Sequence, residues 1–467
     1  MVIGSGPNGL AAAIVLAQAG FAVEVREASS IPGGGASSGE LTLPGFMHDL
    51  GSAAHPMGVS SYFFASLGLE NFGLKWIHSP SPLAHPFQDG TAVTLERDVM
   101  ETASQLGHDG PAYERLYRRL SEHWPQVFRD VFQPQPRIPQ HPFLMAHFGL
   151  RALQPCSMLL NGAFRGGRAK ALVAGSAAHS ALRLEEPVSA AFGLVMGAAG
   201  HAVGWPIAEG GSQQISNALV RVLESLGGRV ATNCRVGSLS EISGAELTMC
   251  DVTPRQFLRL AEGRLRKPFR QLLERFEYGP GIFKMDWALS QPIPWTAREC
   301  FRAATVHVAG SYEEIATSER AAAEGRPPEK PFILLVQPTL FDTTRAPAGR
   351  HIAWAYCHVP QAWRGSAVQQ IEDQIERFAP GFRDCILAKA AHGTQDMERW
   401  DANLVGGDVN GGALNAKQFV LRPTWRQYGT PLKGVYLCSA STPPGGAVHG
   451  MCGYWAAQRA LKDRRLS

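Results

Sequence analysis

Three glycines near the N-terminus, Gly4, Gly6 and Gly9, constrain this chain more than any other feature of its sequence. They stand between a short apolar strand predicted at residues 1–3 and an alanine-rich stretch at 10–20 that is typical of a helix. In this position Gly4 permits a tight turn, Gly6 lets the backbone approach a pyrophosphate, and Gly9 lets the helix pack closely on the sheet. Free amides and the positive end of the helix dipole then favour a dinucleotide over a purely structural turn.

A carboxylate at the end of the next predicted strand narrows the choice of dinucleotide. Glu27 lies eighteen residues after Gly9, where such a site usually places the residue that binds the ribose hydroxyls. Because its negative charge would repel a 2′-phosphate, FAD or NAD is expected rather than NADP. A second glycine-rich loop at 33–35 and a strand–loop–helix at 435–461, with the loop at 442–446, indicate that two more backbone segments approach the ligand.

Length and composition exclude several other classes of protein. A chain of 467 residues predicts two or three domains. Its 45% hydrophobic and 18% charged residues are typical of a globular protein. The 44 basic and 40 acidic residues are spread along the chain, which predicts no nucleic-acid partner.

The cysteines and histidines point to neither a metal nor disulfide bonds. The eight cysteines include no C-x-x-C pair, and the histidines lack the paired spacing of a metal site, so reduced thiols and no metal are expected. The N-terminus lacks the basic region of a cleavable signal, and the apolar run at 190–203 is too short to span a bilayer. The expected location is therefore the cytoplasm, with peripheral membrane contact left open.

Segments spread from one end of the chain to the other resemble the phytoene-desaturase-like FAD-dependent oxidoreductases of the glutathione-reductase-type flavoprotein superfamily. The similarity lies at 2–20, 33–56, 204–219, 279–295 and 436–457. The branch that the sequence resembles is that of bacterial relatives of pyridine nucleotide-disulphide oxidoreductase domain-containing protein 2. The chemistry of that branch is poorly defined, so the resemblance transfers a fold and a cofactor more readily than a substrate.

The resemblance implies an α/β protein: a Rossmann-like FAD-binding domain with a discontinuous mixed α+β substrate domain. The FAD-binding domain would comprise residues 1–78, 203–256 and 424–467. The substrate domain would comprise 79–202 and 257–423.

The same resemblance implies the residues that contact FAD, with the ADP half on the N-terminal unit, the adenine near Val236 and the isoalloxazine at 445–451. The predicted contacts are Gly4, Gly6, Pro7, Asn8, Gly9, Glu27, Gly34, Gly35, Ala36, Ser37, His55, Val236, Ser441, Gly445, Gly446, Val448 and Met451. Two departures from the family pattern stand out. Residues 36–38 lack the arginine that many relatives carry after the glycine triplet, and the stretch between 236 and 247 is shortened.

The predicted reaction is hydride transfer from a substrate carbon to the flavin N5, which leaves a double bond in a lipophilic or secondary-metabolite substrate. The sequence has no C-x-x-x-x-C and no second dinucleotide fingerprint, so oxygen or a quinone is expected to accept the electrons. An apolar or semi-polar substrate would lie against side chains at 143–148, 158–160 and 192–196.

Two alternative functions remain open from the sequence. The altered segment at 36–38 is compatible with a non-redox isomerase that keeps its flavin. An amine-oxidase-like enzyme would line the flavin with aromatic rings, for which Tyr436, Tyr454 and Trp455 are close in sequence.

Three polar residues are candidates for catalysis, each with a structural alternative. Lys284 and Asp286 share one face of a predicted strand. They would form either a charge pair beside the flavin or a solvated salt bridge that contributes little to stability. His449 begins the C-terminal helix, as a proton donor or as a helix cap. His307 and His358 fit core positions better than catalytic ones. Substrate, electron acceptor, catalytic base, oligomeric state (including a homodimer) and the native start codon are left open.

Overall fold

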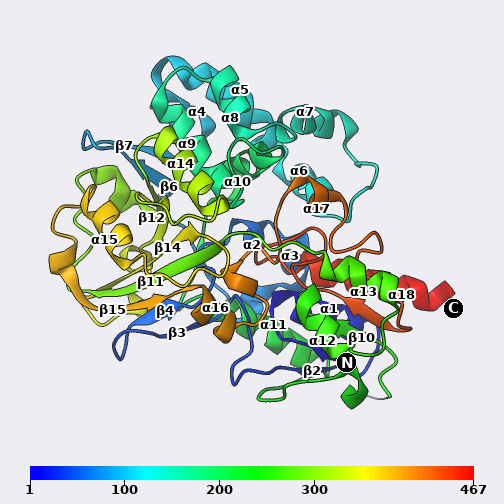
Figure 1. The fold of residues 1–467 in the computed structure, drawn as a ribbon. Helices are drawn as coiled ribbons and strands as arrows, with labels where there is room; N and C mark the ends of the chain where they lie inside the picture. Colours follow the sequence, from blue (N-terminus) through cyan, green and yellow to red (C-terminus); the bar gives the residue numbers. More distant parts are fainter. Residues whose placement is uncertain (243, 467) are drawn as a thin grey trace.

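Two large sheets organise the molecule, which we describe from a computed structural model of residues 1–242 and 244–466 (Figure 1). One sheet has five strands and the other has seven. Both described ends of the chain lie on the side of the five-stranded sheet (Figure 1). Two small antiparallel pairs complete the strands: β3 (Ser38–Glu40) with β4 (Met47–Asp49), and β5 (Trp76–Ile77) with β8 (Ile207–Ala208).

The five-stranded sheet is parallel and gathers segments from distant parts of the sequence. Its order is β16 (Val435–Leu437), β10 (Thr248–Cys250), β1 (Val2–Ile3), β2 (Glu24–Arg26) and β9 (Arg229–Ala231). Three helices accompany these strands: α1 (Pro7–Gln18), α11 (Gln213–Ser225) and α18 (Met451–Leu466). A Cβ on Gly453 would lie 1.8 Å from the Asn8 carbonyl oxygen, so this glycine lets α18 pack against α1.

The predicted βαβ unit is confirmed, with shifted bounds. Helix α1 begins at Pro7, three residues before the predicted start, because the fixed φ of proline suits the first helical position and Gly6 provides the extended N-cap. The predicted terminal helix is present as α18, two residues after His449.

The seven-stranded sheet is antiparallel except where β12 pairs with β6. Its order is β15 (Ile386–His392), β11 (Gly281–Leu289), β14 (His351–Val359), β13 (Ile333–Val336), β12 (Ala303–Val308), β6 (Ser81–Pro86) and β7 (Ala92–Leu95). On β11, Phe283, Met285 and Trp287 belong to an apolar core on one face. The alternate residues Lys284 and Asp286 therefore lie on the other face, as the sequence pattern predicts.

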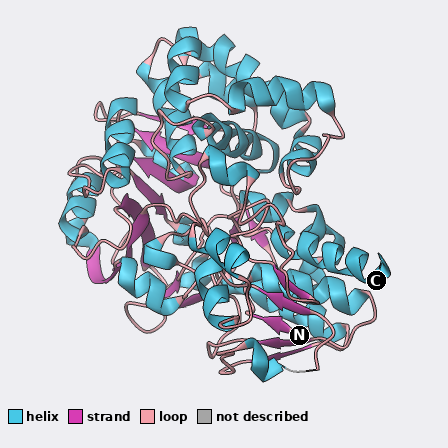
Figure 2. Cartoon of the chain, turned by 45° about the vertical axis from the view of Figure 1, so that its right-hand side comes forward, coloured by secondary structure: helices cyan, strands magenta, loops and turns pink. Residues whose placement is uncertain are grey.

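A layer of helices lies on the side of the molecule away from the two described ends of the chain, above the seven-stranded sheet in the view of Figure 2. These helices are α4 (Val99–Ser104), α5 (Gly110–Glu122), α6 (Trp124–Val131), α7 (Pro142–Ala152), α8 (Cys156–Ala163), α9 (Gly167–Ala178) and α10 (Ser189–Val203). Helix α14 (Tyr312–Ala323) packs against α9. Within the described ranges, no helix is both long enough and apolar enough to cross a bilayer.

Shorter elements connect these layers. The remaining α-helices are α2 (Pro56–Ser60), α3 (Tyr62–Leu67), α12 (Pro254–Leu260), α13 (Lys267–Glu274), α15 (Val368–Glu376), α16 (Thr394–Trp400) and α17 (Ala416–Val420). The 3₁₀ turns are η1 (Leu69–Phe72), η2 (Gly107–Asp109), η3 (Leu239–Ile242), η4 (Arg298–Arg302), η5 (Pro338–Leu340), η6 (Thr343–Arg345), η7 (Arg383–Cys385) and η8 (Val405–Gly407). All eight cysteines are free thiols and seven are buried.

Candidate functional site

A single cavity of about 1230 Å³ connects the two sheets. Its walls include Gly6 of the N-terminal turn, Gly446 of the C-terminal loop, and Trp354 and Tyr356 of the seven-stranded sheet. Typical cavities for drug-sized ligands measure roughly 300–1000 Å³, so this one has room for a larger ligand or for two ligands together. We call the part beside the five-stranded sheet the dinucleotide end, and the part beside the seven-stranded sheet the substrate end.

The glycines of the N-terminal turn are packed too tightly for any side chain. A Cβ on Gly9 would lie 2.2 Å from the Gly4 carbonyl oxygen, and a Cβ on Gly6 would lie 2.7 Å from Oδ2 of Asp251. Gly4 has φ +95°, in the region that favours glycine. A Cβ on Gly34 would lie 3.2 Å from the Gly6 Cα, so the two glycine-rich loops lie against each other at the cavity wall.

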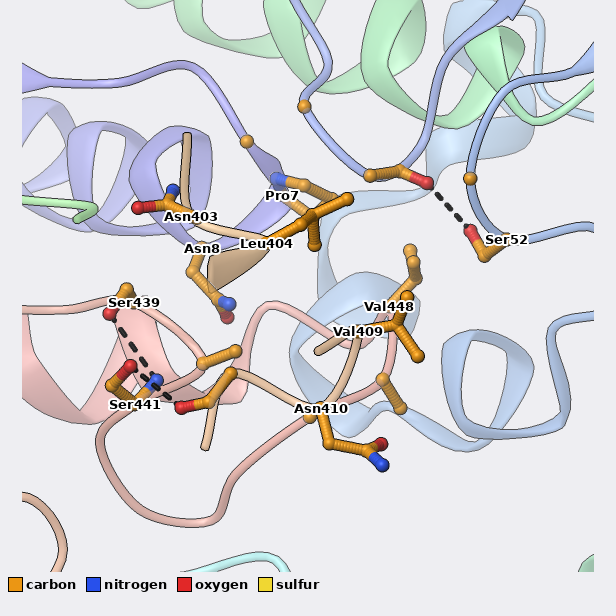
Figure 3. Close-up of a pocket in the computed structure, with 18 of the residues that line it drawn as sticks. Pro7, Asn8, Ser52, Asn403, Leu404, Val409, Asn410, Ser439, Ser441 and Val448 are labelled. Atoms are coloured by element: carbon orange, nitrogen blue, oxygen red, sulfur yellow. Dashed lines mark hydrogen bonds between the residues drawn. The ribbon is translucent and has the colours of Figure 1, made fainter. Parts of the chain in front are cut away.

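The N-terminus of α1 has the features of a dinucleotide site. Pro7 has no N–H, and the Gly9 amide donates to the Asp251 carboxylate at 2.8 Å. Among the described residues, the Asn8 amide of this first turn has no partner and is available to an anion. Pro7 and Asn8 face the cavity with Val448, Leu404 and Val409 (Figure 3). The Asn8 Oδ1 atom is buried with no hydrogen-bond partner among the described residues. The closely packed glycines and the Asn8 amide at the positive end of the α1 dipole fit the diphosphate of FAD.

The Glu27 carboxylate lines the cavity and is held in place by three hydrogen bonds. Its Oε2 accepts from the Ser5 amide at 2.8 Å and the Ser5 hydroxyl at 2.7 Å, and its Oε1 accepts from the Ser29 amide at 2.8 Å. A carboxylate has about four acceptor positions, so one remains for a ribose hydroxyl.

The C-terminal loop brings further predicted contacts to the same cavity. Ser441, Gly446 and Val448 line it, and the Ser441 hydroxyl donates to the Gly411 carbonyl at 2.7 Å (Figure 3). Gly34, Gly35, Ser37, His55 and Val236 also line it. Four predicted contacts lie behind the wall instead: Gly9, Ala36, Gly445 and Met451. The assignment of individual cofactor contacts stays a prediction.

The position without the family's arginine has a structural role in this chain. Ala36 is fully buried, and its carbonyl accepts from the Ser216 hydroxyl at 2.9 Å. The Ser37 hydroxyl donates to the Gly34 carbonyl at 2.7 Å. Short side chains thus brace the glycine loop internally.

Sequence reasoning missed Asp251, which supports the glycine turn from behind. This buried carboxylate follows β10, lines the cavity and accepts from the Gly9 amide at 2.8 Å. Burial raises the pKa of Asp251 to about 8, against the lowering effect of the Gly9 amide. Its only sequence signal is a carboxylate at the end of a short buried strand, and such residues are common.

Sequence reasoning also missed that residues within 401–422, a stretch predicted as part of the substrate domain, line the cavity. Asp401, Asn403 and Leu404 line the dinucleotide end, and the Asn403 amide donates to the Asp251 carbonyl at 3.0 Å. Arg422 lines the cavity and donates to backbone carbonyls, among them Asn410 at 2.9 Å. The run GGDVNGG at 406–412 marks an irregular loop in the sequence.

The catalytic candidates lie away from the cavity wall. Lys284 and Asp286 form an ion pair whose side chains are 1% and 0% exposed, so the interpretation as a solvated salt bridge is wrong. Burial lowers the pKa of Lys284 and raises that of Asp286 to about 6. The Nδ1 of His449 accepts from the Met451 amide at 2.9 Å, in agreement with the capping alternative. None of these three candidates lines the cavity, and His307 and His358 do not line it either.

The substrate end is lined by helices α7 and α10 and by the seven-stranded sheet. From the predicted apolar set, Met145, Phe148, Phe192, Val195 and Met196 line it. Phe143 and Met158 point to solvent instead, with exposed fractions of 86% and 64%.

The aromatic residues considered for an amine-oxidase-like cage pack elsewhere. Tyr436 donates to Asp463 at 3.2 Å, Tyr454 stacks near Phe63, and Trp455 donates to the Phe132 carbonyl at 3.1 Å. None of the three lines the cavity.

Comparisons with known proteins agree with this architecture. Residues 2–66 match the model of the NAD(P)-binding Rossmann-like domain. The chain is 24% identical to pyridine nucleotide-disulfide oxidoreductase domain-containing protein 2 of Rattus norvegicus, over 99% of this chain and 93% of that protein. It is 24% identical to the phytoene desaturase (lycopene-forming) of Pseudescherichia vulneris, over 97% and 96% of the two chains. The solved structure of an oxidoreductase from Methanosarcina mazei matches with a TM-score of 0.67 and 16% identity, over 99% of both chains.

The similarity therefore extends along nearly the whole chain and is not limited to the N-terminal unit. The predicted fold class and the resemblance to phytoene-desaturase-like oxidoreductases are confirmed. Two of the relatives are named as an oxidoreductase domain-containing protein and a phytoene desaturase, and the glycine turn, Glu27 and the C-terminal loop of this chain fit FAD.

Proposed function

We propose that this enzyme dehydrogenates a small lipophilic or semi-polar organic molecule by hydride transfer to the flavin N5. The observation that supports this proposal most directly is the continuity of the cavity. Its lining runs from Gly6 and Glu27 through Gly446 to Tyr356 without interruption by a second site. A substrate at the far end could thus reach a cofactor whose phosphates would be held at the N-terminus of α1.

Each region of the chain has a defined part in this proposal. The glycine turn, the Asn8 amide at the N-terminus of α1 and the Glu27 carboxylate would hold the ADP half, and the loop at 441–448 would hold the isoalloxazine. Bound FAD supplies the electron sink for the substrate hydride. The side chains of α7, α10 and the seven-stranded sheet orient the substrate and exclude water. The division into an FAD-binding and a substrate domain follows from this, with 401–422 shared between them.

The electrons then pass to oxygen or a quinone. The sequence contains no second dinucleotide fingerprint and no C-x-x-x-x-C, and its cysteines are free. Reoxidation by a pyridine nucleotide or through a disulfide therefore has no support in the residues of this chain.

The proposal includes peripheral membrane contact through the exposed apolar side chains on and beside α7. Phe143, Leu150 and Leu153 on or beside α7 are 86%, 73% and 62% exposed, while Met145 and Phe148 of the same helix line the cavity. An apolar substrate can thus pass from a bilayer surface to the substrate end along one helix. Sedimentation with phosphatidylcholine–phosphatidylglycerol vesicles tests this, and Phe143→Ser should reduce the bound fraction. Equal binding of the variant, or none by the native chain, contradicts it.

Anaerobic mixing with candidate substrates tests the reaction itself. The purified protein should be yellow, and a true substrate should bleach the flavin until oxygen or a quinone is admitted. If product forms while the flavin stays oxidised, the protein is instead the non-redox isomerase. Protein that stays colourless after incubation with FAD would overturn the cofactor assignment.

A further inference from the structure

The substrate end carries two polar side chains that lack a protein partner and lie on the cavity wall. Tyr356 of β14 and His179, at the C-terminus of α9, both line the cavity and are only partly buried. The Tyr356 hydroxyl and the His179 Nδ1 have no hydrogen-bond partner among the described residues. Thr305 and Trp354 also line this end, but their unpaired polar atoms are covered by neighbouring atoms. Tyr356 and His179 are therefore the polar groups that a ligand meets here.

The ring of His179 is fixed by a second histidine behind it. Its Nε2 lies 3.0 Å from the Nε2 of His307, so one of these atoms donates and the other accepts. His307 is fully buried on β12 and pairs with Leu334 of β13. Leu334 in turn pairs with Tyr356 of β14. His307 and Tyr356 thus stand in one row of the sheet, with Cα atoms two strand spacings, or roughly 10 Å, apart, and His307 in turn contacts His179.

The surroundings of His307 decide which histidine donates. The Nδ1 of His307 is buried without a partner, and a Cβ on Gly175 would lie only 2.6 Å from it. A nitrogen lone pair can face the C–H of this glycine, whereas an N–H would press hydrogen against hydrogen and remain unpaired. His307 therefore carries its proton on Nε2 and donates it to His179. The accepting His179 then carries its own proton on Nδ1, which makes that atom a donor.

Both groups keep their protons at neutral pH. Burial lowers the pKa of His179 to about 3, so the ring is neutral, and burial raises the pKa of Tyr356 far above its ordinary value. The nearby Glu319 carboxylate, which contacts His358 Nδ1 at 2.7 Å, disfavours an anion at this end. The cationic side chains of the cavity lining are Arg26, Arg235, Arg259, Arg399 and Arg422. None of these belongs to α9, α10 or the seven-stranded sheet.

We propose that His179 Nδ1–H and Tyr356 O–H form a donor pair that binds a neutral oxygen of the substrate, such as a ketone, aldehyde, ester or amide carbonyl. This inference rests on the proposed function and sharpens it. The substrate is a largely apolar molecule with one neutral acceptor oxygen, rather than a plain hydrocarbon, a carboxylate or an amine.

The test compares four probes of one skeleton on the flavin-containing protein as purified. These are 4-phenylbutan-2-one, butylbenzene, 4-phenylbutanoate and 4-phenylbutylamine, with dissociation constants from equilibrium dialysis or headspace partition. The ketone should bind best, and Tyr356→Phe should weaken the ketone roughly fivefold while it leaves butylbenzene unchanged. Tyr312→Phe, on α14 and outside the cavity lining, is the matched control and should change neither.

Two variants of His179 distinguish the contribution of the Nδ1–H donor from that of the size of the ring. His179→Asn places an amide N–H near the former Nδ1 position and should retain most of the ketone affinity. His179→Gln places its amide near the former Nε2 position and should lose roughly fivefold. Equal effects of all these variants on ketone and hydrocarbon, or a preference for the carboxylate or the amine, would overturn the donor pair. Because the assay measures binding, it stays informative if the flavin proves inactive toward every substrate, which would overturn the proposed function alone.

Discussion

The two ends of the cavity are built in different ways. At the dinucleotide end the chain offers mainly its backbone, through closely packed glycines and the N-terminus of α1. At the substrate end it offers side chains, including Tyr356 and His179, on the seven-stranded sheet, on α7 and α10 and at the end of α9. A backbone site depends on a short continuous stretch of sequence, whereas a side-chain site depends on residues that only the fold brings together. The difference predicts that substitutions at the two ends fail in different ways.

The largest expected effect is the loss of FAD when the glycine turn is filled. Gly9→Val would place a branched side chain where even a Cβ meets the Gly4 carbonyl at 2.2 Å. We expect no flavin absorbance in the purified variant, because the turn must open to relieve the clash. Gly167→Ala, on a helix where a Cβ meets nothing within 4 Å, should keep full flavin content. A yellow Gly9→Val protein would show that the turn does not bind the cofactor.

Breaking the buried ion pair of the seven-stranded sheet should instead reduce the stability of the fold. Lys284→Met leaves the Asp286 carboxylate buried without its cation, which typically costs about 3–5 kcal/mol. The double variant Lys284→Met, Asp286→Leu removes both charges and should recover most of that free energy of unfolding, measured in urea. If the single variant unfolds like the native protein but loses turnover with FAD still bound, the pair has a catalytic part after all.

A reversal of charge at Glu27 should weaken FAD retention without abolishing the fold. Glu27→Arg removes the acceptor of the Ser5 amide and hydroxyl and the remaining position for a ribose hydroxyl. We expect at least tenfold weaker binding of FAD to the apoprotein in a flavin-fluorescence titration, and a smaller loss for Glu27→Gln. Unchanged affinity in both variants would mean that the ribose is bound elsewhere.

A further expected effect is a change in the pH dependence of stability at Asp251. Its pKa in the folded chain is about 8, above the ordinary value of 3.8, so the folded state holds a proton that the unfolded state releases. This contribution to stability is complete below about pH 4 and declines as the pH rises toward 8. Asp251→Asn should remove the decline, seen as a diverging difference in urea midpoint between pH 5 and 8. Parallel curves for the two proteins would contradict the raised pKa.

The sequence predicted the dinucleotide end well because its signals are local. Gly4, Gly6 and Glu27 fall within one βαβ unit, and the strand, turn and helix that carry them follow directly from residue type. The C-terminal loop was found through the same strand–loop–helix pattern. All of these segments line one cavity in the structure.

The substrate end was predicted poorly, since an apolar or polar residue on a helix or strand does not reveal what it faces. Phe143 and Phe148 lie on one helix, yet the first is exposed to solvent and the second lines the cavity. His179 drew no attention in the sequence, because its significance depends on His307 and Gly175, which distant segments supply.

By itself the sequence determined the class of ligand: a turn that only glycine can form, followed by a helix and a ribose carboxylate, commits the chain to a dinucleotide. Tertiary structure alone decided which side chains share the cavity with it. The physical reason is one of range. Backbone conformation is set by residues a few positions apart, while burial, tautomer and ionisation depend on packing between elements that may be separated by more than a hundred residues, as His179 and His307 are.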